Sequence, residues 1–184
     1  MKNLWFTSDT HFHHKNILKH CPQSRGHCES VERMNEEIIS NWNNCVRADD
    51  SIIHLGDVSF SSSTDLVKTF SRLNGHKTLV CGNHDKKLRE SGILNELFDQ
   101  VLDYHELSHE GQHIVLSHYP LLTWNRIARG AWMLHGHCHG NMQYPFTGGK
   151  ICDVGVDCWN LSPVSFKTIQ KFMANREIVA LDHH

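Results

Sequence analysis

The stretch Leu4-Trp5-Phe6-Thr7-Ser8-Asp9-Thr10-His11 is a short apolar run, rich in β-forming residues, that ends directly in a carboxylate and an imidazole. A run of this length and composition predicts a buried strand. Asp9 and His11 have side chains that bind divalent metal ions, and they stand where the strand ends. The stretch therefore predicts a strand whose carboxyl end carries metal ligands.

Similar strand-like runs recur along the chain, at residues 51–55, 78–81, 112–117, 132–134 and 151–156. Between and after them, apolar residues recur at helical spacing in three segments. These predicted helices cover residues 31–45, residues 66–73 after a Ser/Thr-rich cap at 61–64, and residues 162 to about 175. The alternation indicates an α/β domain, and a length of 184 residues suits one domain over residues 1–184.

Composition excludes several classes of protein. Lysine and arginine number 18 against 20 aspartates and glutamates, so the net charge of −2 gives no general attraction to nucleic acid or to an anionic membrane. The first residues lack the apolar stretch of a signal peptide, and the seven cysteines include no CxxC pair. We therefore expect a soluble, cytoplasmic protein with reduced thiols and no membrane partner. The 17 histidines are the anomaly, because imidazole is the commonest metal ligand.

Metal-ligand residues follow nearly every predicted strand. In α/β folds ligands bind beyond the carboxyl ends of strands, so residues spread over about 130 positions are expected to meet at one edge. Seven ligands that mix carboxylate, amide oxygen and imidazole are too many for one tetrahedral ion and suit two divalent ions. The expected metal ligands are Asp9, His11, Asp57, Asn83, His118, His137 and His139.

Glycines stand directly before three of these ligands, at Gly56, Gly82 and Gly136. Glycine lets the backbone turn sharply off a strand without steric cost. We expect a tight turn at each of these positions.

At these positions the chain resembles the calcineurin-like metallophosphoesterase superfamily, whose pattern DxH, GD, GNH[DE], H and GHxH is met in full and in order. The resemblance covers residues 4 to about 165. The local sequence at residues 7–12, 54–57 and 134–137 is similar to that of a small single-domain subgroup of bacterial and phage phosphohydrolases. The resemblance implies two packed mixed β-sheets flanked by helices, a four-layer αββα sandwich.

The resemblance also implies a role for each residue of the site. Asp57 would bridge two metals, and His84 would face the leaving group with Asp85 beside it as orienting partner. One metal would be held by Asp9, His11 and His139, and the other by Asn83, His118 and His137.

This division of roles agrees with the chemistry of phosphate esters. Two metals can share a bridging hydroxide with a pKa near neutrality and hold the phosphoryl oxygens during an in-line displacement. A departing alkoxide needs a proton, and imidazole, which ordinarily titrates near pH 6.5, is suited to donate it. Manganese is the expected metal, with Fe, Zn, Ni and Co as alternatives that the same ligands accept.

Several neighbouring residues have two interpretations. We expect His54 and His135 to be hydrogen-bonded groups behind the ligands. The segment His13-His14-Lys15-Asn16 suits either contact with the substrate phosphate or a solvated loop. Arg126 and Arg129, near Trp124, suit either contact with the ester's organic part or a phosphate oxygen, or an amphipathic segment. A structural zinc site at His20, Cys21, His27 and Cys28 is not favoured, because the usual ligand spacing is absent.

The expected function is hydrolysis of a phosphodiester or phosphomonoester, with a nucleotide or cyclic nucleotide ranked first as the small phosphate-ester substrate. One alternative is a nuclease or nucleic-acid-end phosphatase, which a basic stripe with interleaved aromatic residues would support. Another is a metal-binding scaffold without catalysis. The presence of His84 argues against the scaffold, because metal binding does not require that residue.

Overall fold

Two mixed β-sheets form the centre of the fold in the computed structural model, which describes residues 2–144 and 148–180. In the first sheet the strands lie in the order β4-β3-β2-β1-β9, and all neighbours are parallel except β9, which is antiparallel to β1. Its strands are β1 (Leu4–Thr7), β2 (Ser51–His54), β3 (His76–Val80), β4 (Gln100–Leu102) and β9 (Val164–Ser165).

The second sheet has the order β5-β6-β7-β8. Strands β6, β7 and β8 are parallel to one another, and β5 is antiparallel to β6. The strands are β5 (His105–His109), β6 (Gln112–Leu116), β7 (Trp132–His135) and β8 (Ile151–Asp153).

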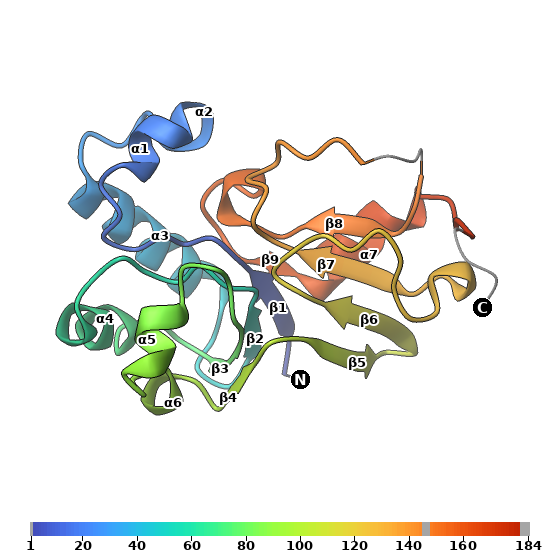
Figure 1. The fold of residues 1–184 in the computed structure, drawn as a ribbon, viewed down its shortest axis with the longest axis horizontal. Coiled ribbons are helices and arrows are strands. Elements are labelled where there is room, and N and C mark those ends of the chain that lie inside the picture. The colour runs from blue at the N-terminus through green and yellow to red at the C-terminus, as the bar shows by residue number, and fades with distance from the viewer. Residues whose placement is uncertain (1, 145–147, 181–184) are drawn as a thin grey trace.

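Most helices lie on the side of the first sheet that is turned away from the second sheet, whereas the last helix, α7 (Phe166–Ala174), lies on the side of the second sheet (Figure 1). The longest is α3 (Val31–Cys45), where Ser30 caps the first turn by accepting a hydrogen bond from the backbone N–H of Arg33. The other helices are α1 (Ile17–His20), α2 (Pro22–Arg25), α4 (Ser63–Phe70), α5 (Lys86–Glu90) and α6 (Leu94–Leu97).

Three apolar clusters match the layers of the expected sandwich. Met34, Ile38 and Trp42 of α3 are fully buried in the cluster between the helices and the first sheet. Phe6 of β1 and Leu134 of β7 lie in a second cluster, which joins the two sheets and includes residues of α7. The outer face of the second sheet is covered by a thinner layer around Trp124 and the short 3-10 helix η1 (Ile127–Arg129). The predicted α/β sandwich of two mixed sheets is thereby confirmed.

The predicted helix from residue 162 begins later than expected, at Phe166. Val164 and Ser165 pair with β1 as strand β9, and the Ser165 hydroxyl accepts a hydrogen bond from the N–H of Thr168, which makes Ser165 the N-cap. Strand β8 also ends before residue 156, because Val156–Cys158 forms the 3-10 helix η2. Tertiary pairing therefore decides both boundaries.

The parallel strands direct their carboxyl ends to a common region of the molecule. β1, β2 and β3 end together in the first sheet, and β6 and β7 end together in the second. An isolated parallel bridge between Ser8 and Gly155 connects the loops beyond the two sheets. Among the described residues no helix is apolar over enough length to cross a membrane.

Candidate metal centre

Asp9, His11 and His139 form the first ligand cluster. Their ligand atoms all lie within 4.8 Å of one another, and Nε2 of His11 is 3.9 Å from Oδ1 of Asp9. Asp9 and His11 are fully buried and His139 is half-buried. The loops after β1 and β7 thus bring together residues that are far apart in the sequence.

Asp57, His118 and His137 form the second cluster, and their ligand atoms also lie within 4.8 Å of one another. Asn83 belongs to the same group, because its Oδ1 atom is 3.0 Å from Nε2 of His118. All seven residues predicted as ligands therefore lie at the carboxyl ends of the strands in two neighbouring clusters.

Asp57, a member of the second cluster, also lies next to the first cluster. Its Oδ2 atom is 3.8 Å from Nε2 of His11, and its Oδ1 atom is 3.6 Å from Nε2 of His118. A single carboxylate is thus within reach of both groups of imidazoles, as a shared ligand has to be.

The residues of the first cluster fit a cation. Within residues 2–144 and 148–180, the buried atoms Oδ1 of Asp9 and Nε2 of His11 have no hydrogen-bond partner. Burial raises the pKa of the Asp9 carboxyl to about 8 and lowers the pKa of His11 to about 2, so burial opposes charge on both. Unpaired buried polar atoms are costly, and a divalent ion would pair both of these.

Hydrogen bonds at Nδ1 direct two of the imidazoles. Nδ1 of His118 lies 2.6 Å from the carbonyl oxygen of Leu55, and Nδ1 of His139 lies 2.7 Å from Oδ2 of Asp157. Because a carbonyl or carboxylate accepts the Nδ1 proton, Nε2 is the nitrogen that each ring would offer to a metal ion in its neutral form. Metal-binding histidines are commonly oriented in this way.

Asp157 and Arg25 belong to the site but were not predicted from the sequence. The guanidinium of Arg25 is fully buried and donates to both oxygens of Asp157, from Nε at 2.8 Å and from Nη2 at 2.6 Å. Burial raises the pKa of Asp157, but the hydrogen bonds from Arg25 and His139 outweigh burial and hold it well below its usual range. Neither residue lies in a recognisable motif, so only their contacts reveal them.

The pKa of the His139 imidazole is shifted in the opposite direction to that of His11. Burial lowers its pKa, but the hydrogen bonds with Asp157 and Cys21 and the nearby Asp9 carboxylate outweigh burial and raise the pKa to about 10. The surroundings of His139 are therefore strongly electronegative, which suits a cation site.

The glycines before the ligands are required for two different reasons. Gly56 has φ +92°, a conformation that favours glycine. At the other two positions there is no room for a side chain. A Cβ atom at Gly82 would lie 2.3 Å from Oδ1 of Asp57, and a Cβ atom at Gly136 would lie 1.9 Å from Oγ of Ser8. The expected tight turn thus explains Gly56, whereas close approach to the site explains the other two.

Five of the seven predicted ligands have left-handed backbone conformations. The φ angles are 55° for Asp9, 48° for His11, 59° for Asp57, 70° for His137 and 49° for His139. Such conformations cost about 1–3 kcal/mol per non-glycine residue and concentrate at functional sites. The surrounding fold therefore holds the ligand loops in strained conformations.

His84 lies beside Asp57, with its side chain 46% exposed. Its Nε2 atom is 3.8 Å from Oδ2 of Asp57, its backbone N–H donates to Oδ1 of Asp57 at 2.9 Å, and its ring centroid is 4.8 Å from that of Phe60. The imidazole is thus close to the ligands and open to a substrate.

Asp85 does not have the expected role of orienting the His84 ring. Its buried carboxylate accepts hydrogen bonds from the backbone N–H groups of Asp57, Val58 and Gly82 at 2.8–2.9 Å. None of its hydrogen bonds within the described part of the chain involves the His84 ring. Asp85 instead ties the loop after β2 to the loop after β3, and so positions Asp57.

The two histidines that follow the first motif, His13 and His14, point in different directions. His13 points away from the ligands: its Nε2 atom is 2.9 Å from Oγ1 of Thr69, and its Nδ1 atom accepts from Asn35 at 3.2 Å. His14 lies at the site, with its ring stacked on Phe60 at 3.8 Å and 5.5 Å from that of His11.

His54 and His135 are hydrogen-bonded groups behind the ligands, as expected. His54 contacts Thr10 Oγ1 at 3.0 Å, and His135 contacts Tyr144 Oη at 2.7 Å.

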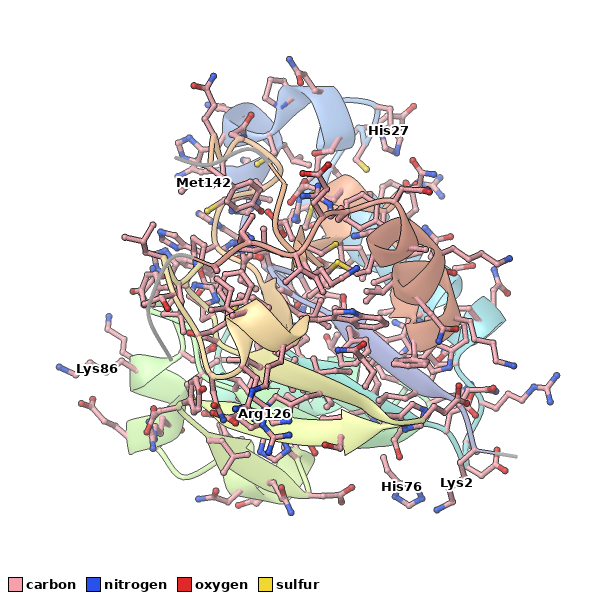
Figure 2. The ribbon with its side chains drawn as sticks, turned by 90° about the vertical axis from the view of Figure 1, so that its right-hand side faces the viewer. Lys2, His27, His76, Lys86, Arg126 and Met142 are labelled. Carbon is pink, nitrogen blue, oxygen red and sulfur yellow. The ribbon has the colours of Figure 1, made fainter. Side chains whose placement is uncertain are left out.

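Arg126 and Arg129 lie at the amino end of β7, whereas His137 and His139 follow its carboxyl end. Figure 2 shows Arg126 on the side of the molecule that faces the viewer, well below His27. Both are exposed, whereas the neighbouring Trp124 and Ile127 are buried, which fits the interpretation as an amphipathic segment.

The residues considered for a structural zinc site divide between two places. His27 and Cys28 lie against Glu37, whereas Cys21 lies beside His139 and Asp157. Cys21 and Cys28 therefore belong to separate groups of ligand-type side chains, which does not favour a four-ligand zinc site.

Comparison with known proteins gives relatives along nearly the whole chain. The uncharacterized protein MJ1445 of Methanocaldococcus jannaschii is 34% identical over 97% of this chain and 96% of its own length. Protein AQ665 of Aquifex aeolicus, a crystal structure of unknown function, has a TM-score of 0.74 and 29% identity over 94% of this chain and all of its own. The phosphoesterase Yfce from E. coli has a TM-score of 0.42 and 18% identity over 83% of this chain and 78% of its own. No model of a known protein family matches the chain.

Proposed function

Because this chain belongs to the family of MJ1445 and its motifs resemble those of the calcineurin-like metallophosphoesterase superfamily, we propose that it is a metal-dependent hydrolase of phosphate esters that binds two divalent ions. The position of Asp57 carries the proposal, since its two oxygens lie 3.8 Å from Nε2 of His11 and 3.6 Å from Nε2 of His118. One carboxylate between two ligand clusters suits a pair of ions better than a single ion.

The first ion would be held by Asp9, His11 and His139, and the second by Asn83, His118 and His137, with Asp57 shared. Ions held in this way activate water as a nucleophile at neutral pH and neutralise charge on the phosphoryl oxygens. Manganese is our first choice, and Fe, Zn, Ni and Co are alternatives because imidazole and carboxylate ligands accept them all.

His84 would act on the leaving group. Its exposed imidazole stands next to the shared ligand Asp57, so it can reach an ester oxygen bound there. As the bond between phosphorus and that oxygen breaks, the imidazole would donate a proton to the oxygen, which then leaves as an alcohol. Asp85 would act indirectly, by holding the loop that carries Asp57.

A metal-supplemented activity panel tests the proposal. Protein stripped by a chelator and then loaded with Mn2+ is assayed on a phosphomonoester, a cyclic nucleotide, a dinucleotide and an oligonucleotide. We expect hydrolysis that disappears with the chelator, returns with Mn2+ and is strongest on a nucleotide or cyclic nucleotide. Elemental analysis should find two ions per chain. A single ion at saturation would refute the shared role of Asp57.

The panel also separates the alternative functions. A clear preference for the oligonucleotide would favour a nuclease or a nucleic-acid-end phosphatase, which the net charge of −2 does not support. Two bound ions without hydrolysis of any ester would favour a metal-binding scaffold. The position of His84 beside Asp57 argues for catalysis, because an exposed imidazole there adds nothing to metal binding.

A further inference from the structure

A cavity of about 620 Å3 opens beside His139, next to the first ligand cluster. Its walls come from α2, from the loop after β7 and from η2 with the turn that follows. His139 and Asp157 belong to both the cavity and the ligand network, so a group bound in the cavity would lie next to the metal ligands. Sites for small organic molecules commonly have volumes of about 300–1,000 Å3. A phosphate alone would leave most of this space unfilled.

The cavity is lined by side-chain amides and by carboxylates that already have partners. Gln23, Asn141 and Asn160 present side-chain amides to it. The carboxylate of Glu37 is paired with His27 at 3.0 Å, and Asp157 is paired with Arg25. No lysine or arginine is among the described residues that line it. Since phosphates are bound mainly by arginine and lysine, a second phosphate does not suit this cavity.

The turn that carries Asn160 is held in a fixed conformation. Asn160 and Leu161 have φ angles of 52° and 53°, which side-chain-bearing residues adopt rarely. The amide of Asn41 in α3 donates to the carbonyl oxygens of both residues, at 3.2 Å and 3.3 Å. Within residues 2–144 and 148–180, the side-chain amides of Gln23 and Asn160 make no hydrogen bond. Both therefore have donors and acceptors for a ligand.

A row of rings connects His84 with the cavity. The ring centroids of His84 and Phe60 are 4.8 Å apart, those of Phe60 and His14 are 3.8 Å apart with an angle of 16°, and those of His14 and His20 are 6.3 Å apart. Phe60 is 41% exposed, and His20 lines the cavity. Planar groups stack favourably on such rings.

We propose that this cavity binds the uncharged, planar, hydrogen-bonding part of the substrate, a group of the nucleoside type, while the phosphoryl group lies at the two ligand clusters. This inference rests on the proposed hydrolysis of phosphate esters. Gln23 and Asn160 then determine specificity without taking part in the bond-breaking step.

Two diesters with the same leaving group test the inference: thymidine 5′-(4-nitrophenyl phosphate) and methyl 4-nitrophenyl phosphate. Because both release 4-nitrophenolate, a difference in KM reports the group that stays on the phosphorus. We expect a KM for the thymidine ester about tenfold lower than for the methyl ester, since about two hydrogen bonds are gained. Equal KM values in the unmodified protein would overturn the inference.

Two variants locate the effect. Gln23→Ala removes one amide, and Asn160→Gly removes the other with a residue that suits the left-handed backbone. Each should raise KM for the thymidine ester about three- to tenfold and leave kcat and the methyl ester unchanged. Gln170→Ala, at an exposed glutamine of α7, is the matched control and should change neither ester. Equal effects on both esters would contradict a role in binding the nucleoside.

A binding measurement separates failure of the inference from failure of the proposed function. If neither diester is hydrolysed with metals bound, the proposed function fails, and the cavity is then tested by titrating 15N-labelled protein with thymidine. Shifts of the Gln23 and Asn160 side-chain amides at millimolar thymidine would support the cavity as a nucleoside site. Unchanged amide signals at both residues would overturn it.

Discussion

Nδ1 of His139 lies 2.7 Å from Oδ2 of Asp157, and the same carboxylate is bound by the buried guanidinium of Arg25. Arg25 also donates to the backbone carbonyl oxygen of Asp9 at 2.6 Å. The Arg25–Asp157 pair therefore connects Asp9 with His139, the two ends of the first ligand cluster. It holds the His139 ring and the Asp9 loop in one arrangement.

Replacing Asp157 by asparagine should weaken one ion selectively. The variant keeps the size of the side chain but removes the charge that accepts the Nδ1 proton of His139. Loss of such a partner typically lowers metal affinity about 10- to 100-fold, so we expect this loss for the first ion and retention of the second. Equilibrium dialysis with elemental analysis measures both. Asp99→Asn, at an exposed carboxylate, is the control, and equal loss of both ions in Asp157→Asn would contradict the assignment.

Asp57 and His139 should differ in how many ions depend on them. Asp57→Asn should lower the occupancy of both ions and nearly abolish turnover, because the carboxylate lies within 4 Å of imidazoles from both clusters. His139→Gly, which suits the φ angle of 49°, should weaken mainly one ion. The ratio of metal to protein in dialysed samples distinguishes them. Loss of a single ion in both variants would rule out the shared position of Asp57.

His84→Ala should separate catalysis from metal binding. Proton donation to a leaving group typically contributes about 100- to 10,000-fold, so turnover of an alkyl phosphodiester should fall by that factor with both metals retained. The loss should be much smaller for a 4-nitrophenyl ester, whose oxygen leaves without a proton. Steady-state kinetics on both esters gives the comparison. Equal slowing of the two would replace proton donation by a role in positioning the phosphate.

His76→Ala is the matched control for His84→Ala. His76 is exposed at the amino end of β3, whereas His84 lies beyond the carboxyl end of the same strand. Figure 2 shows His76 at the bottom of the molecule, near Lys2. The variant should keep both metals and full turnover on both esters.

Asp50 provides a prediction about stability that does not involve the metal site. Burial raises the pKa of its carboxyl, but hydrogen bonds from the backbone of Asn3 and Arg47 and from the side chains of Trp5 and Asn3 outweigh burial and lower it from the ordinary 3.8. Asp50→Asn should therefore lower the free energy of unfolding by about 1–3 kcal/mol at pH 7.

The pH dependence of this loss follows from the lowered pKa. The contribution of Asp50 is complete above about pH 5, where the carboxyl is almost fully ionised even in the unfolded chain, and it is lost as the pH falls through the lower pKa of the folded state. Urea unfolding of both proteins between pH 7 and pH 2 should show a difference in the free energy of unfolding that is constant down to about pH 5 and shrinks below it. Asp49→Asn, at the exposed neighbour, should have little effect. A difference that grew at low pH would contradict the assignment.

The sequence predicted secondary structure best where a segment has a regular pattern of apolar residues. The predicted strand at residues 4–7 and the predicted helix at residues 31–45 agree with β1 and α3, because each buries an uninterrupted apolar pattern. Strands β4 and β5 were not predicted, since they are short, partly exposed and rich in polar residues. Their pairing with β3 and β6 stabilises them, and no local pattern records that pairing.

At the site, the sequence alone predicted seven residues as metal ligands and their convergence at one edge, because the chemistry of a ligand belongs to its side chain and strand ends bring such residues together. Only the tertiary structure decided which nitrogen of His139 and His118 faces the cluster, that Asp85 holds backbone rather than His84, and that His14 rather than His13 lines the site. The physical reason is that the direction of each of these side chains depends on its hydrogen-bond and packing partners, which come from distant parts of the chain. Arg25 and Asp157 are separated by 132 residues, and only folding brings their side chains within 2.6 Å.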